Sequence, residues 1–138
     1  MNSPKSFCPQ NLYLEIFGDK WSLLIIRDIM FNNKRYFREF LQSKEKIASN
    51  ILSNRLKLLE EEGILYKKSD ASHKQKIRYS LTKKGIDVFP ILIENARWSL
   101  KYNPVDKDDA IKAQNIIAGG QIKIQAMMNE LKAIHLPK

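Results

Sequence analysis

The chain has 138 residues, which is enough for one compact domain with an additional element and too short for two domains of common size. Its 24 Lys and Arg residues outnumber 15 Asp and Glu residues, and the net charge of +9 favours a partner rich in phosphate or an anionic surface. The only cysteine is Cys8, which excludes an intramolecular disulfide framework and a cysteine-rich zinc site.

The sequence also indicates where the protein acts. A single cysteine suits the reducing cytosol. The longest apolar run, residues 23–26, is far below the roughly 20 residues that a membrane span needs. Residues 1–7 are too short and too polar for a signal peptide. We therefore expect a cytoplasmic protein with no membrane partner.

Two helices are predicted in the first 33 residues. Pro9 is favourable in a first helical turn, and apolar residues then repeat at helical spacing as far as Gly18. Residues 20–30 are apolar on nearly every side, which predicts a central helix covered by its neighbours. Asn32 and Asn33 form the turn that ends this helix.

A short strand and two further helices are predicted next. Residues 35–37 favour a very short strand, and the apolar stripe in residues 37–41 predicts a short third helix. A fourth helix is predicted over about 48–62. Gly63 follows it at the position where a left-handed residue commonly ends a helix.

A hairpin and a fifth helix complete the first 103 residues. Residues 64–68 and 77–81 are β-type runs on either side of the polar segment 69–76, which predicts a hairpin. Thr82 is a favourable cap for a fifth helix, and we expect Pro90 to bend that helix because proline removes a backbone donor.

The last segment predicts a long helix with a heptad-like apolar seam. Residues 103–104 end the preceding helix, and three aspartates then favour the positive end of a new helix dipole. Gly119 and Gly120 interrupt the seam, and glycines destabilise a helix, so we expect a close crossing or a kink at a dimer interface. The seam consists of Ala110, Ala113, Ile117, Gly120, Ile124, Met127, Leu131 and Ile134.

The order of these elements matches the winged helix-turn-helix plan, in which one helix enters the major groove and the hairpin contacts the backbone of DNA. The predicted fold class is therefore mainly α with a small β-hairpin wing (α+β), with N- and C-terminal dimerisation helices. We expect residues 1–103 to form the DNA-binding domain with an N-terminal arm, and residues 104–138 to form a helical extension used for dimerisation.

The fourth predicted helix has an apolar face and a polar face without acids. Asparagine can hydrogen-bond an adenine edge in a bidentate way, hydroxyls can donate or accept, and lysine can reach phosphate. A solvated helix face explains this pattern equally well on its own. The residues of the polar face are Ser49, Asn50, Ser53, Asn54 and Lys57.

Arg55 lies nearer the apolar face of the same helix. A partly buried arginine usually needs a carboxylate, and Glu39 on the preceding helix is a candidate partner. A phosphate contact by Arg55 is the alternative, so we keep Arg55 among the candidate DNA-binding residues.

The predicted hairpin carries a large positive charge. Residues 67–84 contain seven basic residues and one acid, a local charge of +6. A basic hairpin directly after a polar, acid-poor helix favours phosphate contacts over a solvated surface. The candidate DNA-binding residues in the wing are His73, Lys74, Lys76 and Arg78.

Several motifs in the right order resemble the HxlR family of bacterial regulators. The resemblance covers about residues 8–100 and implies a homodimer with two winged domains that acts on promoters near its own gene. Family members commonly carry prolines in the wing, where this chain has none. The motifs are Cys8-Pro9, Gly18-Asp19-Lys20-Trp21, Arg27, Tyr36-Phe37-Arg38-Glu39-Phe40, residues 47–56, Leu59-Glu60, Gly63 and residues 79–85.

Cys8 is a candidate redox sensor. The helix dipole stabilises a thiolate at a helix N-terminus, and Lys5 lies close in the sequence, so a lowered pKa is expected for Cys8. The resemblance has the same implication, because in some HxlR-type regulators the cysteine at this position senses oxidants or electrophiles. A redox or small-molecule effector is therefore a candidate partner. A cysteine retained for packing beside the second helix is the alternative.

The expected function is a sequence-specific transcription regulator, a repressor, that binds a pseudo-palindromic double-stranded operator as a homodimer. No catalytic residue, cofactor or metal site is predicted, because the sequence shows no nucleophile with a base, metal cluster or phosphate loop. His73 and His135 lack spaced zinc ligands and are expected at the surface. A non-specific protein of the nucleoid type and a helical interaction module remain the alternatives.

Overall fold

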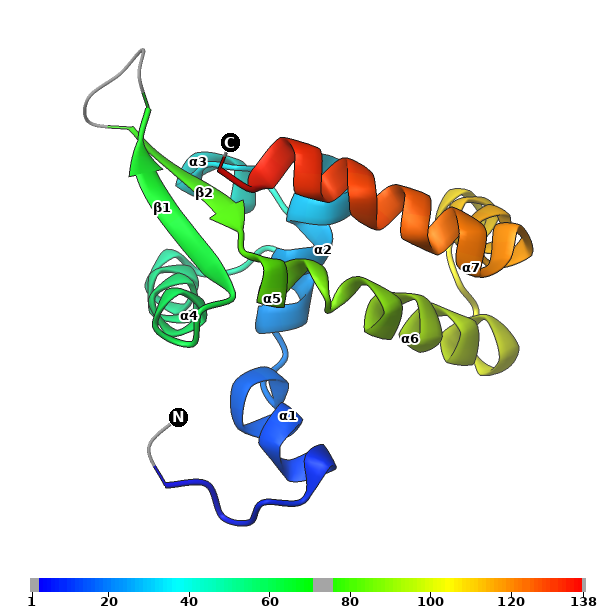
Figure 1. Cartoon of the computed structure of the whole chain (residues 1–138), viewed down its shortest axis with the longest axis horizontal. Coiled ribbons are helices and arrows are strands. Elements are labelled where there is room, and N and C mark those ends of the chain that lie inside the picture. Colours follow the sequence, from blue (N-terminus) through cyan, green and yellow to red (C-terminus); the bar gives the residue numbers. More distant parts are fainter. Residues whose placement is uncertain (1–2, 71–75, 138) are drawn as a thin grey trace.

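Two helices follow the N-terminal arm, and both begin and end close to the predicted positions (Figure 1). The computed structural model describes residues 3–70 and 76–137. Helix α1 spans Pro9–Phe17, with its proline in the first turn, where the missing N–H has no helical partner to lose. Helix α2 spans Ser22–Asn32 and ends at Asn33, whose φ of 54° is left-handed.

Helices α3 and α4 form the middle of the chain. Helix α3 is short, Phe37–Phe40, and helix α4 spans Ser49–Glu61. Gly63 follows α4 with a φ of +73°, which confirms the predicted left-handed position after this helix. The predicted short strand is reduced to a single antiparallel bridge between Tyr36 and Arg78.

A charged cluster fixes the turn before α4. Arg27 on α2 donates to both carboxylate oxygens of Glu45, at 2.7 and 2.8 Å, and to the buried Asp28 at 2.9 Å. The hydrogen bonds from Arg27 lower the pKa of Glu45 to about 2. Bidentate pairs of this kind hold a defined geometry, so the cluster sets where α4 begins relative to α2.

The predicted hairpin is a two-stranded antiparallel sheet. Strand β1 spans Leu65–Ser69 and strand β2 spans Ile77–Leu81. Leu65 pairs with Leu81 at the end nearest the core, where both side chains are buried. The other end of the sheet projects from the molecule as the wing (Figure 1).

The helix predicted after Thr82 is wrong in one respect. The chain forms two helices there, α5 over Lys83–Ile86 and α6 over Phe89–Tyr102, instead of one bent helix. Pro90 lies in the first turn of α6, where its missing N–H costs no hydrogen bond. Pro90 therefore starts a helix and does not kink one.

The core lies between α2, α4, the inner end of the sheet and α5. Its side chains come from helices that precede the hairpin in the chain and from helices that follow it. The core therefore holds α4 and the hairpin in one unit. The most completely buried members are Ile26, Ile29, Phe40, Leu52, Leu59, Ile64, Leu81, Ile86 and Phe89.

Helix α7 spans Lys107–His135 and changes direction at a kink. Gly120 has φ 65° and ψ −159°, a conformation that only glycine adopts readily, which confirms the predicted kink. The second half of α7 then returns along α6 to the base of the wing (Figure 1). Ile124 and Leu131 of the predicted seam are buried within their own chain. A dimerisation role for this helix stays a prediction.

His135 joins the end of α7 to the wing. Its side chain is 2% exposed, so the prediction of a surface histidine is wrong. The backbone N–H of Leu81 donates to Nδ1 of His135 at 3.1 Å, and the Tyr66 hydroxyl donates to the carbonyl oxygen of His135. The last turn of α7 therefore contacts both strands of the wing.

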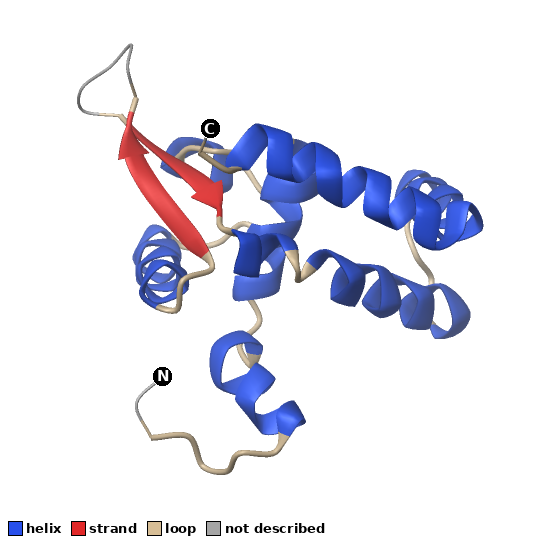
Figure 2. Cartoon of the chain, viewed as in Figure 1, coloured by secondary structure: helices blue, strands red, loops and turns tan. Residues whose placement is uncertain are grey.

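The described residues confirm the predicted mainly helical fold with one small wing (Figure 2). No helix within residues 3–70 and 76–137 has the length and apolar character required to cross a membrane.

Candidate nucleic-acid interface

Helix α4 turns its polar face to solvent. Its apolar side is buried in the core through residues such as Leu52 and Leu56. The helix and the wing project from the same end of the molecule, away from the turn between α6 and α7 (Figure 1). All five residues predicted for the polar face are exposed, namely Ser49, Asn50, Ser53, Asn54 and Lys57.

Arg55 bridges α4 and the start of α2. Its Nη1 lies 3.4 Å from Oδ1 of Asp19, and its side chain is 25% exposed. The predicted partner, Glu39, is wrong: the Glu39 carboxylate instead accepts the backbone N–H groups of Arg35 and Tyr36 at the start of α3. Because Glu39 caps α3, Arg55 pairs instead with Asp19, a carboxylate more distant in sequence.

Asp19 has a fixed position because it caps α2. Its Oδ2 accepts the backbone N–H groups of Trp21 at 2.8 Å and Ser22 at 2.9 Å, and its Oδ1 accepts the Ser22 hydroxyl at 2.6 Å. Burial alone would raise the pKa of Asp19, but the hydrogen bonds from Ser22 and Trp21 hold it below its usual value. The carboxylate is therefore charged at neutral pH and able to pair with Arg55.

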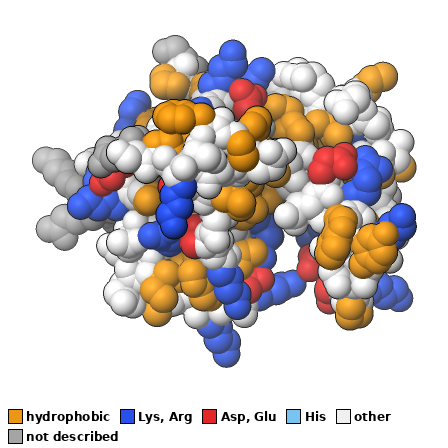
Figure 3. Space-filling model, turned by 90° about the horizontal axis from the view of Figure 1, so that it is seen from below, with side chains coloured by type: hydrophobic (Ala, Val, Ile, Leu, Met, Phe, Trp, Pro, Cys, Tyr) orange, Lys and Arg blue, Asp and Glu red, His pale blue; other side chains and the backbone are white. Residues whose placement is uncertain are grey.

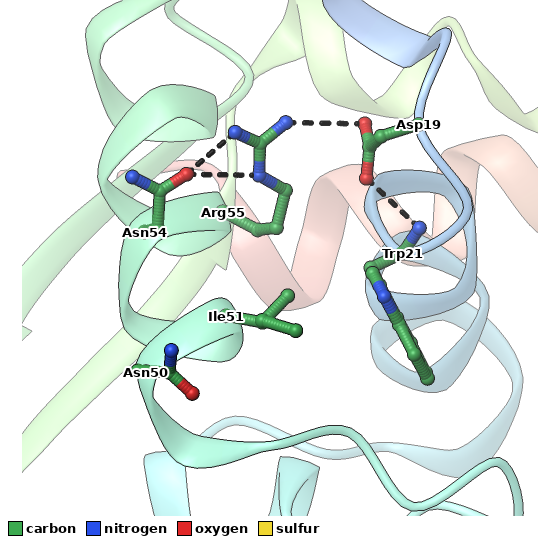
Figure 4. A pocket seen from close by; sticks show the side chains of 6 residues that line it. All are labelled: Asp19, Trp21, Asn50, Ile51, Asn54 and Arg55. Atoms are coloured by element: carbon green, nitrogen blue, oxygen red, sulfur yellow. Dashed lines mark hydrogen bonds and ion pairs between the residues drawn. The ribbon is translucent and has the colours of Figure 1, made fainter.

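An open hollow of about 430 Å³ lies between this corner and α4 (Figure 4). Ile51 and the Trp21 ring form its apolar wall, and Asn50 lies at its edge. The Asp19 and Arg55 pair closes one side. The hollow is continuous with the polar face of α4, so a group bound against that face could enter it.

The outer end of the two-stranded sheet carries a second cluster. Lys76 Nζ lies 4.0 Å from the centre of the Tyr36 ring, a cation–π contact, and the Tyr36 hydroxyl donates to Asp70 at 2.6 Å. Arg78 is exposed beside them on β2. His73 and Lys74, the other two predicted wing residues, lie outside the described residues.

Sequence reasoning missed Arg38 and Gln42 of this surface. Together with Tyr36, Glu39 and Lys76 they line a shallow hollow of about 460 Å³. An aromatic residue, Tyr36, followed closely by the basic Arg38 at the start of a short helix was the available signal. Nothing local shows that this segment lies against β2, because the pairing depends on a bridge to Arg78, 42 positions away.

Cys8 is the N-cap of α1 and is exposed. Its sulfur accepts the backbone N–H of Asn11 at 3.4 Å. This hydrogen bond lowers the pKa of the Cys8 thiol below its usual value, in the direction expected from the helix N-terminus. The thiol is thus accessible to reagents and disposed to ionise.

Metal binding has no visible support in the described ranges. Within residues 3–70 and 76–137, no three His, Cys, Asp or Glu side chains come close enough together to hold a metal ion.

The chain is similar in sequence to known regulators. The model of a family described as HxlR-like helix-turn-helix matches residues 16–107. YdeP, an HTH-type transcriptional regulator of Bacillus subtilis, is 30% identical over 106 residues, which are 77% of this chain and 80% of YdeP.

Solved structures of regulators share the fold. The redox regulator HypR in its oxidised form is 28% identical, with a TM-score of 0.62, over 71% of this chain and 100% of the HypR chain. The reduced form of the transcriptional regulator YodB from B. subtilis is 27% identical, with a TM-score of 0.59, over 73% of this chain and 100% of the YodB chain. Residues 108–138, most of α7, lie beyond the family match.

Proposed function

The chain belongs to the HxlR-like helix-turn-helix family of transcription regulators, and we propose that it acts in the cytoplasm as a homodimeric, sequence-specific repressor. The observation that carries this proposal is the exposed polar face of α4, free of acids, beside the exposed basic residues of the wing. The helix supplies amides and hydroxyls for base edges, and the wing supplies cations for phosphates.

A homodimer is supported by exposed apolar side chains outside the DNA-facing end. Leu14 on α1, Trp98 and Tyr102 on α6, and Ile122 on α7 are each more than half exposed. Figure 3 shows hydrophobic side chains exposed among the basic ones on one face of the molecule. Large exposed apolar residues are a common feature of interaction surfaces. Two copies related by a twofold axis would read a pseudo-palindromic operator.

Selection of random DNA duplexes with the purified protein tests this function. We expect one enriched pseudo-palindrome, because two α4 helices would meet two equivalent half-sites. Asn50→Ala should remove preference at one base of each half-site, whereas Lys76→Ala should weaken all duplexes alike. Equal binding of all duplexes would instead support the non-specific, nucleoid-type alternative. If the protein bound no duplex, the result would support the alternative of a helical interaction module.

Redox control through Cys8 is the second part of the proposal. The support is an exposed thiol with a lowered pKa at the start of α1, the helix that follows the N-terminal arm. HypR is named a redox regulator, and YodB is known in a quinone-bound form. Cys8 has no second cysteine in its chain, so oxidation would give an intersubunit disulfide, a mixed disulfide or a sulfenic acid.

Mild oxidation is expected to modify Cys8 and to change operator binding. Peroxide or quinone is added, intact mass is measured by mass spectrometry, and operator affinity is measured on the same samples. Cys8→Ser is the matched control and should keep its affinity after treatment. The sensor role is rejected if wild-type protein stays unmodified, or if Cys8→Ser loses or gains affinity as wild type does.

A further inference from the structure

The Asn54 side chain has its oxygen occupied. Oδ1 of Asn54 accepts hydrogen bonds from Nε of Arg55 at 3.1 Å and from Nη2 of the same residue at 2.5 Å. An amide oxygen has two lone pairs, so both are engaged by the guanidinium. Figure 4 shows the amide nitrogen pointing away from Arg55. Asn54 therefore offers a partner two N–H donors and no free acceptor.

Arg55 cannot easily release the Asn54 side-chain oxygen, because the Arg55 side chain is itself held by Asp19. Its Nη1 pairs with Asp19, and Asp19 is held by three hydrogen bonds from the start of α2. Turning the amide over would place the N–H groups of Asn54 against a cation. Hydrogen bonds from a charged donor are roughly twice as strong as neutral ones, so the observed orientation is strongly favoured.

Asn50, one helical turn earlier, is a natural comparison. It also lies on the exposed face of α4, but its amide makes no hydrogen bond to any residue within 3–70 and 76–137. Asn50 keeps both a donor and an acceptor for a base edge. Two asparagines on one face thus present different chemistry, and the difference comes from Arg55.

We infer that Asn54 recognises guanine and rejects adenine, with Arg55 as the positioning residue that sets this choice. The inference rests on the proposed sequence-specific DNA binding. A bidentate contact to adenine needs an acceptor for the N6 amino group and a donor for N7. Guanine presents two adjacent acceptors, N7 and O6, in the major groove, which match two N–H donors. The held amide could donate one N–H to adenine N7, but its other N–H would face the adenine amino group, so the second hydrogen bond of the bidentate contact would be lost.

The test uses the selected operator and single base changes within it. Asn54→Ala first identifies the base that Asn54 reads, as the position where this variant loses its preference. In wild type that base is expected to be guanine, and replacing it by adenine should weaken binding about 5- to 150-fold. In Arg55→Met the amide is free to rotate, so the ratio of guanine to adenine affinities should fall about fivefold or more.

Arg97→Met is the matched control, because it removes the same charge from an exposed arginine on α6 that pairs only with Glu94 in the described structure. It should leave the guanine-to-adenine ratio unchanged, and thermal unfolding checks that each variant is folded. The inference is overturned if wild type reads adenine at this position, if Asn54→Ala changes no base preference, or if folded Arg55→Met keeps the wild-type ratio. Enrichment of no duplex would overturn the proposed function as well.

Discussion

Raising monovalent salt from about 50 to about 200 mM is expected to weaken operator binding by about 10³- to 10⁵-fold. Two α4 helices and two wings would neutralise roughly 6 to 10 phosphates, and each neutralised phosphate releases condensed counterions. The logarithm of the affinity should therefore fall with the logarithm of the salt concentration at a slope of about −5 to −9. Fluorescence anisotropy with a labelled duplex measures this slope.

Lysine variants locate the source of the salt effect. Lys76→Ala should reduce the magnitude of the slope by about 1 for each phosphate that the variant no longer neutralises. Lys101→Ala is the control, since Lys101 lies over the Tyr102 ring in the last turn of α6. That end of α6 is on the opposite side of the molecule from the wing (Figure 1). A slope near zero in wild type, or equal changes in the two variants, would contradict phosphate binding by the wing.

Lowering the pH from 7 to 5 is expected to reduce the free energy of unfolding by about 2 kcal/mol through His135. Burial lowers the pKa of His135 from 6.5 to about 4, and the positive charges of Arg35 and Arg78 act in the same direction. Between these two pH values the unfolded chain binds a proton at His135 that the folded chain does not. Stability is therefore complete above pH 6.5 and falls as the pH decreases towards 4.

Urea unfolding at a series of pH values measures this loss, with His135→Asn as the control. An asparagine oxygen can still accept the Leu81 N–H but does not titrate, so this variant should lose the pH dependence between 7 and 5. Glu45, with a pKa of about 2, affects stability only below its unfolded value of 4.5 and stays outside the window. Equal pH dependence in both proteins would show that His135 does not stay neutral in the folded chain.

The features predicted well from sequence are those that depend on local pattern. The two faces of α4, the hairpin and the left-handed position of Gly63 each follow from spacing within a few residues. Pro90 was assigned wrongly because proline is compatible with both a bend and a helix start, and only packing around it distinguishes them.

Contacts between distant segments could not be predicted. From the sequence, Glu39 was the carboxylate expected to pair with Arg55, and the observed pairing with Asp19 depends on Glu39 capping α3. The burial of His135 depends on a hydrogen bond to a residue 54 positions earlier. Asn54 offers only hydrogen-bond donors because Arg55, which is paired with Asp19, occupies the Asn54 side-chain oxygen. The base preference of Asn54 therefore could not be predicted from the residue type alone.

The kink at Gly120 has a consequence for the order of folding during synthesis. Because α7 changes direction there, the chain returns to the wing only at His135, 54 positions after Leu81 and 69 after Tyr66. The ribosome releases these strands well before it completes the last turn of α7, and domains fold from the N-terminus as they emerge. A nascent chain thus forms the hairpin first without its support. The wing reaches its final packing only once His135 has emerged, and a product truncated before His135 would leave the base of the wing exposed to water and to proteases.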